Sequence, residues 1–135
     1  MEELKIQALV ENLEQVLAFI DSYVEKVGCD IKTQMQLDIA VEEIFVNIAS
    51  YAYENGTGDA TILVSKPDEP ERIEVTFVDT GVAYNPLEKE DPDITLSAEE
   101  REIGGLGIFM VKKSMDTMAY KREDGQNILT ITKNL

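Results

Sequence analysis

Two polar side chains in the first half of the chain have the types and spacing needed for phosphoryl transfer. Glu43 and Asn47 are four residues apart within residues 31–54, whose apolar spacing predicts a helix. Four residues make about one turn, so both side chains should share one edge of the helix. Around the helix axis, Asn47 is more than about 90° from Glu42. The amide oxygen of Asn suits Mg²⁺, and a carboxylate one turn away can accept a hydroxyl proton. Alternatively, the pair only solvates the flank of an amphipathic helix.

A second motif, Asp79-Thr80-Gly81, stands at the end of an apolar strand candidate at residues 72–79. A carboxylate leaving a strand can accept a hydrogen bond from an exocyclic amine, and the glycine lets a ring approach the backbone. A buried aspartate is costly without a partner, and a ligand amine would be a suitable one. Taken alone, the motif also fits an ordinary strand-to-turn junction.

A third motif contains Gly104, Gly105 and Gly107, directly before a helix predicted over residues 106–118. Backbone N–H groups at a glycine-rich helix entry can hold phosphates. The spacing matches neither the P-loop nor the dinucleotide-binding glycine motif. A hinge or a close-packed helix entry is the alternative interpretation.

The elements that would position these residues are mixed in type. Helices are predicted over residues 11–27, 31–54 and 106–118, and strands over 3–9, 60–65 and 72–79. The last two strands form a terminal hairpin across Asp124–Gly125. We therefore expect one domain over residues 1–135 with an α+β fold, a two-layer sandwich of a mixed, mostly antiparallel sheet with helices on one face. One apolar stripe of the second helix should face the sheet, and it consists of Leu37, Val41, Ile44, Ile48 and Tyr51.

Composition excludes several other chemistries. The chain has no histidine and a single cysteine, Cys29, so Ser–His–Asp catalysis, Cys–His catalysis and an internal disulfide are impossible. The net charge of −15 disfavours nucleic acid and anionic lipid surfaces as partners. No signal peptide or long apolar run is present, which predicts no membrane association and a cytoplasmic location.

The three motifs occur in the order Glu43-x-x-x-Asn47, Asp79-x-Gly81, Gly105-x-Gly107. In this order and separation they resemble the N, G1 and G2 boxes of the GHKL ATPases, which have the Bergerat fold. Within that superfamily the chain looks most like the anti-sigma-factor serine/threonine kinases. The resemblance covers nearly the whole chain.

The resemblance implies a role for each matching position. Glu43 would be the catalytic base and Asn47 the Mg²⁺ ligand. The remaining ATP contacts implied are Asp79 and Gly81 at the adenine, Gly105 and Gly107 at the triphosphate, Thr130 beside the adenine, and Arg101 at a phosphate. Residues 87–103 would form the ATP lid.

The resemblance also implies a function. The chain would be an ATP-binding anti-sigma regulatory factor that phosphorylates a small antagonist protein, with a sigma factor as its other partner and a homodimer as its assembly. A catalytic fragment of a sensor kinase fits poorly, because the chain has no phosphoacceptor histidine. The alternative is a non-catalytic ATP-binding module that sequesters a sigma factor or another regulator. The composition of the lid segment slightly favours this alternative, since it contains seven acidic residues and only two basic ones, Lys89 and Arg101.

Overall fold

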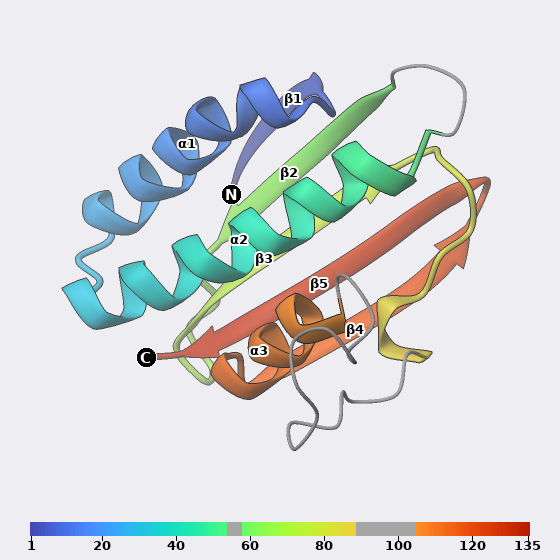
Figure 1. The fold of residues 1–135 in the computed structure, drawn as a ribbon. Helices are drawn as coiled ribbons and strands as arrows, with labels where there is room; N and C mark the ends of the chain where they lie inside the picture. The colour runs from blue at the N-terminus through green and yellow to red at the C-terminus, as the bar shows by residue number, and fades with distance from the viewer. Residues whose placement is uncertain (54–57, 89–104) are drawn as a thin grey trace.

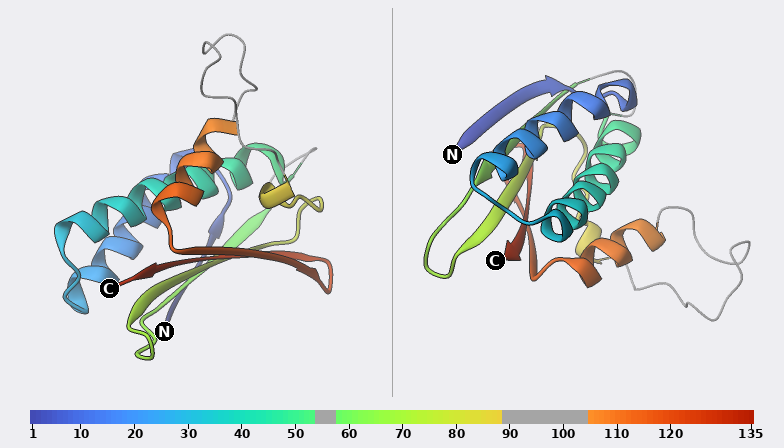
Figure 2. Two further views of the ribbon diagram at one scale, coloured as in Figure 1. Left: turned by 90° about the horizontal axis from the view of Figure 1, so that it is seen from below. Right: turned by 90° about the vertical axis from the view of Figure 1, so that its left-hand side faces the viewer.

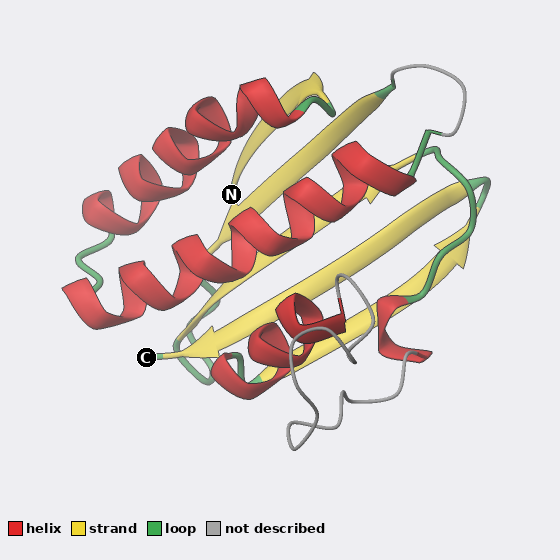
Figure 3. Ribbon diagram, in the orientation of Figure 1, coloured by secondary structure: helices red, strands yellow, loops and turns green. Residues whose placement is uncertain are grey.

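The computed structural model describes residues 1–53, 58–88 and 105–135. Across these residues, three α-helices cover one face of a five-stranded sheet (Figures 1 and 3). The strands are β1 (Glu2–Gln7), β2 (Asp59–Ser65), β3 (Arg72–Asp79), β4 (Thr117–Glu123) and β5 (Gln126–Asn134). The helices are α1 (Leu13–Lys26), α2 (Ile31–Tyr51) and α3 (Gly105–Ser114), with short 3₁₀ turns at Val10–Asn12 and Pro86–Glu88. The predicted α+β sandwich is confirmed, although the sheet of the described residues is antiparallel throughout and not mixed.

The sheet has the strand order β1-β2-β3-β5-β4, and every pair of neighbours in it is antiparallel. The hairpin between β4 and β5 turns at Asp124 (φ 51°) and Gly125 (φ 75°). Two consecutive residues with positive φ are typical of the tight hairpin turn that suits twisted strands, which confirms the predicted terminal hairpin. In the β3–β5 pair, Asp79 lies directly opposite Asn127, and this register brings the end of β3 to the beginning of β5.

Alternation along the strands decides which side chains face the helices. In β3 the buried positions are Ile73, Val75, Phe77 and Asp79, and the residues between them are partly exposed on the other face. Apolar side chains at such positions pack under the helices and form the core. Figure 2 shows that all three helices lie on the same side of the sheet. Asp79 is therefore a carboxylate at the end of a core-facing row.

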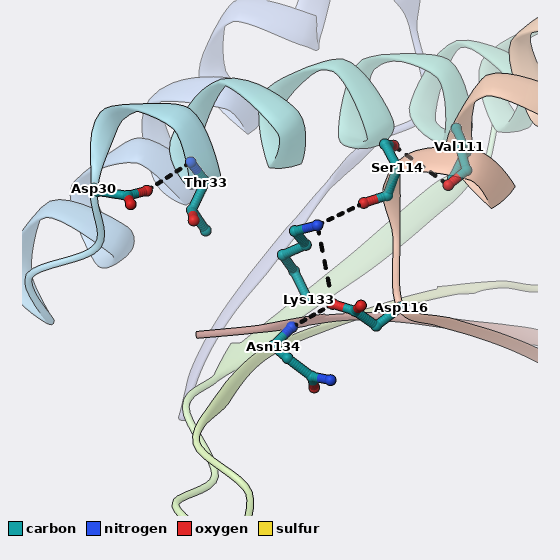
Figure 4. Close-up of polar contacts among 7 residues, drawn as sticks. All are labelled: Asp30, Thr33, Val111, Ser114, Asp116, Lys133 and Asn134. Atoms are coloured by element: carbon teal, nitrogen blue, oxygen red, sulfur yellow. Dashed lines mark hydrogen bonds and ion pairs between the residues drawn. The ribbon is translucent and has the colours of Figure 1, made fainter.

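The helix α2 begins at a capped residue and is shorter than predicted. The Asp30 carboxylate accepts a hydrogen bond from the Thr33 backbone N–H at 2.8 Å (Figure 4), which satisfies one of the free donors of the first turn. The prediction of residues 31–54 is correct at the beginning, but α2 ends at Tyr51. Residues 54–57 lie outside the described part of the chain. Tyr51 is also an exception to the predicted core-facing stripe, because 53% of it is exposed.

The end of α3 differs more from the prediction. The helix ends at Ser114, whose carbonyl accepts a hydrogen bond from Lys133 Nζ at 3.0 Å (Figure 4). Two residues later the backbone N–H of Asp116 donates to the Thr132 carbonyl, and β4 starts at Thr117. The predicted helix over 106–118 was wrong at its end because pairing with β5 takes over there. Helical spacing of apolar residues cannot report this competition from a neighbouring strand.

Candidate functional site

A hollow of about 490 Å³, counted with its open mouth, lies between α2, the beginning of α3 and the adjoining ends of β3 and β5. Its walls are mainly apolar, and they include Ile44, Ile48, Phe77, Ile108 and Leu129. Three side chains with a carboxylate or an amide group also line it, and these are Asn47, Asp79 and Asn127. An apolar slot with a few polar groups is the usual design of a pocket for a small planar ligand.

Asp79 presents one carboxylate oxygen to protein donors. The residue is 6% exposed, and its Oδ1 accepts hydrogen bonds from the Gly81 backbone N–H and from Asn127 Nδ2, both at 2.9 Å. Among the described residues, no hydrogen bond reaches Asp79 Oδ2. Asp79 lines the pocket, so this free oxygen can accept a hydrogen bond from a donor on a bound ligand, such as an exocyclic amine.

Gly81 lets the turn after β3 lie directly against the end of α2. A Cβ built on Gly81 would overlap the carbonyl oxygen of Ala52, which caps α2. The same carbonyl accepts a hydrogen bond from the Val82 backbone N–H at 2.8 Å. Only glycine allows this close approach, so the turn that holds Asp79 is attached to α2.

Asn127 is a site residue that the sequence analysis missed. It is 6% exposed, its side chain bonds to Asp79, and it lines the same pocket. A signal was present in the sequence, because Asn127 occupies an inward position of the alternating strand that continues with Leu129 and Ile131. A polar residue in a row of core positions indicates a specific partner.

Glu43 and Gly107 lie against each other, although they are far apart in the sequence. A Cβ built on Gly107 would overlap Oε2 of Glu43. The carboxylate from α2 therefore lies beside the first turn of α3. Gly105 and Gly107 are within that turn rather than before the helix, since α3 begins at Gly105. The first turn of a helix offers unpaired backbone N–H groups that can bind anions.

The two acidic residues in the middle of α2 differ in position, as the helical wheel predicts. Glu42 is exposed, whereas Glu43 and Asn47 are partly buried. Asn47 lines the pocket one turn after Glu43. No described residue forms a hydrogen bond with the side chain of Glu43 or Asn47, so both remain available to a ligand.

Two other predicted positions do not join this group. Thr130 lies on the face of the sheet away from the helices, where its hydroxyl pairs with that of Thr76 at 3.1 Å. The expectation that Thr130 touches the adenine is therefore not supported, because the pocket is on the opposite face. Arg101, Gly104 and positions 89–103 of the expected lid lie outside the described residues.

Comparison with protein families places the chain. The model for the histidine kinase-like ATPase domain matches residues 6–133. The chain belongs to this family. The matched range contains every motif of the site, from Glu43 to Asn127.

Relatives in this ATPase family include two kinases. The serine/threonine-protein kinase BtrW of Bordetella bronchiseptica is 28% identical over 103 residues, which cover 76% of this chain and 72% of the relative. The serine-protein kinase RsbW of Bacillus mycoides is 26% identical over 131 residues, covering 94% and 81%. Serine kinases of this type are the group that the three sequence motifs resemble.

A solved structure agrees with the family at the level of the fold. The crystal structure of the RsbU and RsbW domains of a Mycobacterium tuberculosis protein matches all of this chain with a TM-score of 0.64 and 15% identity. The chain spans about a third of that protein's length, 33%. None of the helices described for this ATPase-family chain combines the length and the apolar character that crossing a membrane requires.

Proposed function

We propose that this histidine kinase-like ATPase chain binds ATP and phosphorylates a serine or threonine of a small antagonist protein, and that it also binds a sigma factor as an anti-sigma regulator. The position of Glu43 carries the proposal. Its carboxylate lies against Gly107 in the first turn of α3, at the edge of a pocket that contains Asp79. The relatives BtrW and RsbW, which are named as serine or serine/threonine protein kinases, support the same reaction.

The residues suggest how the reaction would proceed. The adenine would enter the apolar pocket, and its amine would donate a hydrogen bond to Asp79 Oδ2. The phosphates would extend to the first turn of α3. Glu43 would accept the proton of the acceptor hydroxyl as the new oxygen–phosphorus bond forms. The bond between the γ-phosphorus and its bridging oxygen would break, and ADP would leave.

Asn47 would hold Mg²⁺ in this scheme. Its side chain lines the pocket without a hydrogen-bond partner among the described residues, and its amide oxygen is a hard ligand that the ion accepts. When bound, Mg²⁺ would neutralise negative charge on the phosphate oxygens. By family resemblance we also expect a homodimer, and a monomeric mass in light scattering would contradict that expectation.

Calorimetry with ATP, with and without Mg²⁺, tests the nucleotide site. We expect one ATP per chain, with tighter binding in Mg²⁺. Asn47→Ala should weaken binding in Mg²⁺ more than binding without the ion, because it removes only the metal ligand. No heat at millimolar ATP would refute the proposed function.

Phosphoryl transfer is tested with γ-labelled ATP in a lysate of the source organism supplemented with the purified protein. Glu43→Gln should reduce labelling of the acceptor protein by about 100-fold or more, because a general base contributes on that order. Its ATP affinity should stay within about threefold of wild type. Glu42→Gln removes the same charge from an exposed neighbour and should retain transfer.

A second candidate function is a non-catalytic ATP-binding module that sequesters a regulator. The observation in its favour is the excess of acidic residues in residues 87–103, a poor match to a triphosphate. Under this alternative, ATP binds the wild-type protein, yet no acceptor is labelled. Equal background labelling with wild type and Glu43→Gln would decide for it.

A further inference from the structure

Asn127 forms hydrogen bonds with four residues around the pocket through one side-chain amide. Its Nδ2 donates to Asp79 Oδ1 at 2.9 Å and to the Val82 carbonyl at 2.8 Å. Its Oδ1 accepts from the Tyr84 backbone N–H at 3.3 Å and from the Tyr120 hydroxyl. These partners belong to the end of β3, the turn that follows it, and β4. The amide therefore joins a turn and two strands at the polar end of the pocket.

The orientation of this amide is determined by its partners. Rotating it by half a turn would place the carbonyl oxygen of Asn127 against the Asp79 carboxylate and the Val82 carbonyl, so two acceptors would meet acceptors. The NH₂ group would then face the backbone N–H of Tyr84, which cannot accept a hydrogen bond. In the observed orientation both amide hydrogens and both lone pairs are used. Asn127 consequently has no hydrogen-bonding capacity left for a ligand, although it lines the pocket.

The effect of Asn127 on a ligand must therefore pass through Asp79. With Oδ1 occupied by Asn127 and Gly81, only Oδ2 of the carboxylate is free to accept a hydrogen bond. Other side chains also hold this turn, since Arg122 donates to the Gly81 carbonyl at 2.8 Å and Tyr53 accepts from the Thr80 N–H at 3.1 Å. Those contacts reach the backbone. Among the described residues, Asn127 is the side chain that orients the carboxylate itself.

We infer that Asn127 is a positioning residue that sets the base selectivity of the site. It turns Asp79 so that a pure acceptor faces the ligand ring, which favours a 6-amino purine over a 6-oxo purine. This inference rests on the proposed ATP-binding function. A 6-oxo base would place its carbonyl oxygen against Asp79 Oδ2, and a site built for a hydrogen bond discriminates strongly against a ligand that lacks the donor.

The test compares the affinities for ATP and for ITP, which carries a 6-oxo group. The wild type should bind ATP at least tenfold more tightly than ITP. Asn127→Asp keeps the size of the side chain and its acceptor for Tyr84 and Tyr120, but replaces the amide donor to Asp79 by a second carboxyl group. Two carboxyl groups this close share a proton, so Asp79 no longer presents a pure acceptor to the ligand ring, and we expect the ATP-to-ITP ratio to fall by about tenfold or more. General loss of stability would weaken both nucleotides alike and leave the ratio unchanged.

Asn134→Asp is the matched control, since it adds the same charge at an exposed position of the same strand. It should retain the wild-type ratio. A ratio in Asn127→Asp within twofold of wild type would refute the selectivity role.

A measurement on the unaltered protein covers the case in which Asn127→Asp does not fold. By NMR, the side-chain NH₂ hydrogens of Asn127 in the nucleotide-free protein should exchange with solvent at least about tenfold more slowly than those of Asn134. The reason is that both hydrogens of the Asn127 amide already have acceptors within the protein. Protection that arises only after ATP is added would make Asn127 a ligand contact and overturn the inference. If the amide is protected but no ATP binds, the proposed function fails, and with it the selectivity role, leaving Asn127 as a structural brace.

Discussion

Replacing Asp38 by Asn should stabilise the protein at neutral and alkaline pH. Asp38 on α2 and Asp21 on α1 each have a buried Oδ1 atom, and no described residue gives either atom a hydrogen bond while both groups are ionised. Burial raises the pKa of Asp38 to about 7, and the hydrogen bond to Asp21 and the charges of Asp21 and Glu25 act in the same direction. The physical picture is a protonated Asp38 that donates to Asp21 between the two helices.

The magnitude and sign follow from linkage. Since the pKa in the folded protein lies above the ordinary value of 3.8, the folded state holds a proton that the unfolded chain releases. Stability therefore falls as the pH rises from about 4 to about 7, and the full penalty is present above that range. Moving the pKa of Asp38 this far corresponds to about 4 kcal/mol. Because the side chain is only partly buried and solvent screens the interaction, we expect about 1–2 kcal/mol.

Urea unfolding of the wild type and Asp38→Asn at pH 5, 6, 7 and 8 measures this effect. The variant should be more stable by about 1–2 kcal/mol at pH 8, and its advantage should shrink steadily toward pH 5, because Asn carries no titrating proton. Glu3→Gln, at an exposed position of β1, is the control for loss of one negative charge. Its unfolding free energy should differ little from that of the wild type at every pH. An advantage that does not change with pH, or a less stable variant at pH 8, would refute the reasoning.

Four further predictions concern three glycines and a helix cap. Gly107→Ala should change the unfolding free energy by less than about 1 kcal/mol but reduce phosphoryl transfer at least tenfold. The reason is that its Cβ displaces the movable carboxylate of Glu43. An equal loss of ATP binding and of phosphoryl transfer would speak against this. Gly81→Ala should destabilise by about 1–3 kcal/mol in urea unfolding, since its Cβ meets backbone rather than a movable side chain, and unaltered stability would contradict the close approach. Asp30→Ala should lower the unfolding free energy by about 1 kcal/mol, because the helix cap is lost. Gly125→Ala should lower it by about 1–2 kcal/mol, because the glycine has a positive φ. A thermal melt without a shift would count against the prediction for that variant.

Much of the secondary structure could be predicted because it depends on local spacing. The alternation in β3 and the turn at Asp124–Gly125 agree with the prediction, as does the beginning of α2. The position of Glu43 relative to Glu42 could also be predicted, since a helix of known period determines which residues share an edge. The end of α3 could not, because there the chain leaves helical spacing for pairing with β5.

The residues around the base pocket show why strand positions are harder to assign. Thr130 was expected beside the adenine, but side chains of a strand alternate between faces, and its position in β5 points away from the helices. Asn127, three residues earlier, points inward. An odd difference in position reverses the face, so the register of the whole sheet decides which residue enters the pocket.

The sequence by itself determined the three motifs, their order, and the helix and strands that carry them, because these depend on residue type and local period. Only the tertiary structure decided that Asp79 meets Asn127, 48 residues away, and that Glu43 meets Gly107. The first contact comes from the antiparallel register of β3 and β5, and the second from the packing of α3 beside α2. Both depend on burying the apolar faces of all the elements together, a condition that no local stretch of sequence contains.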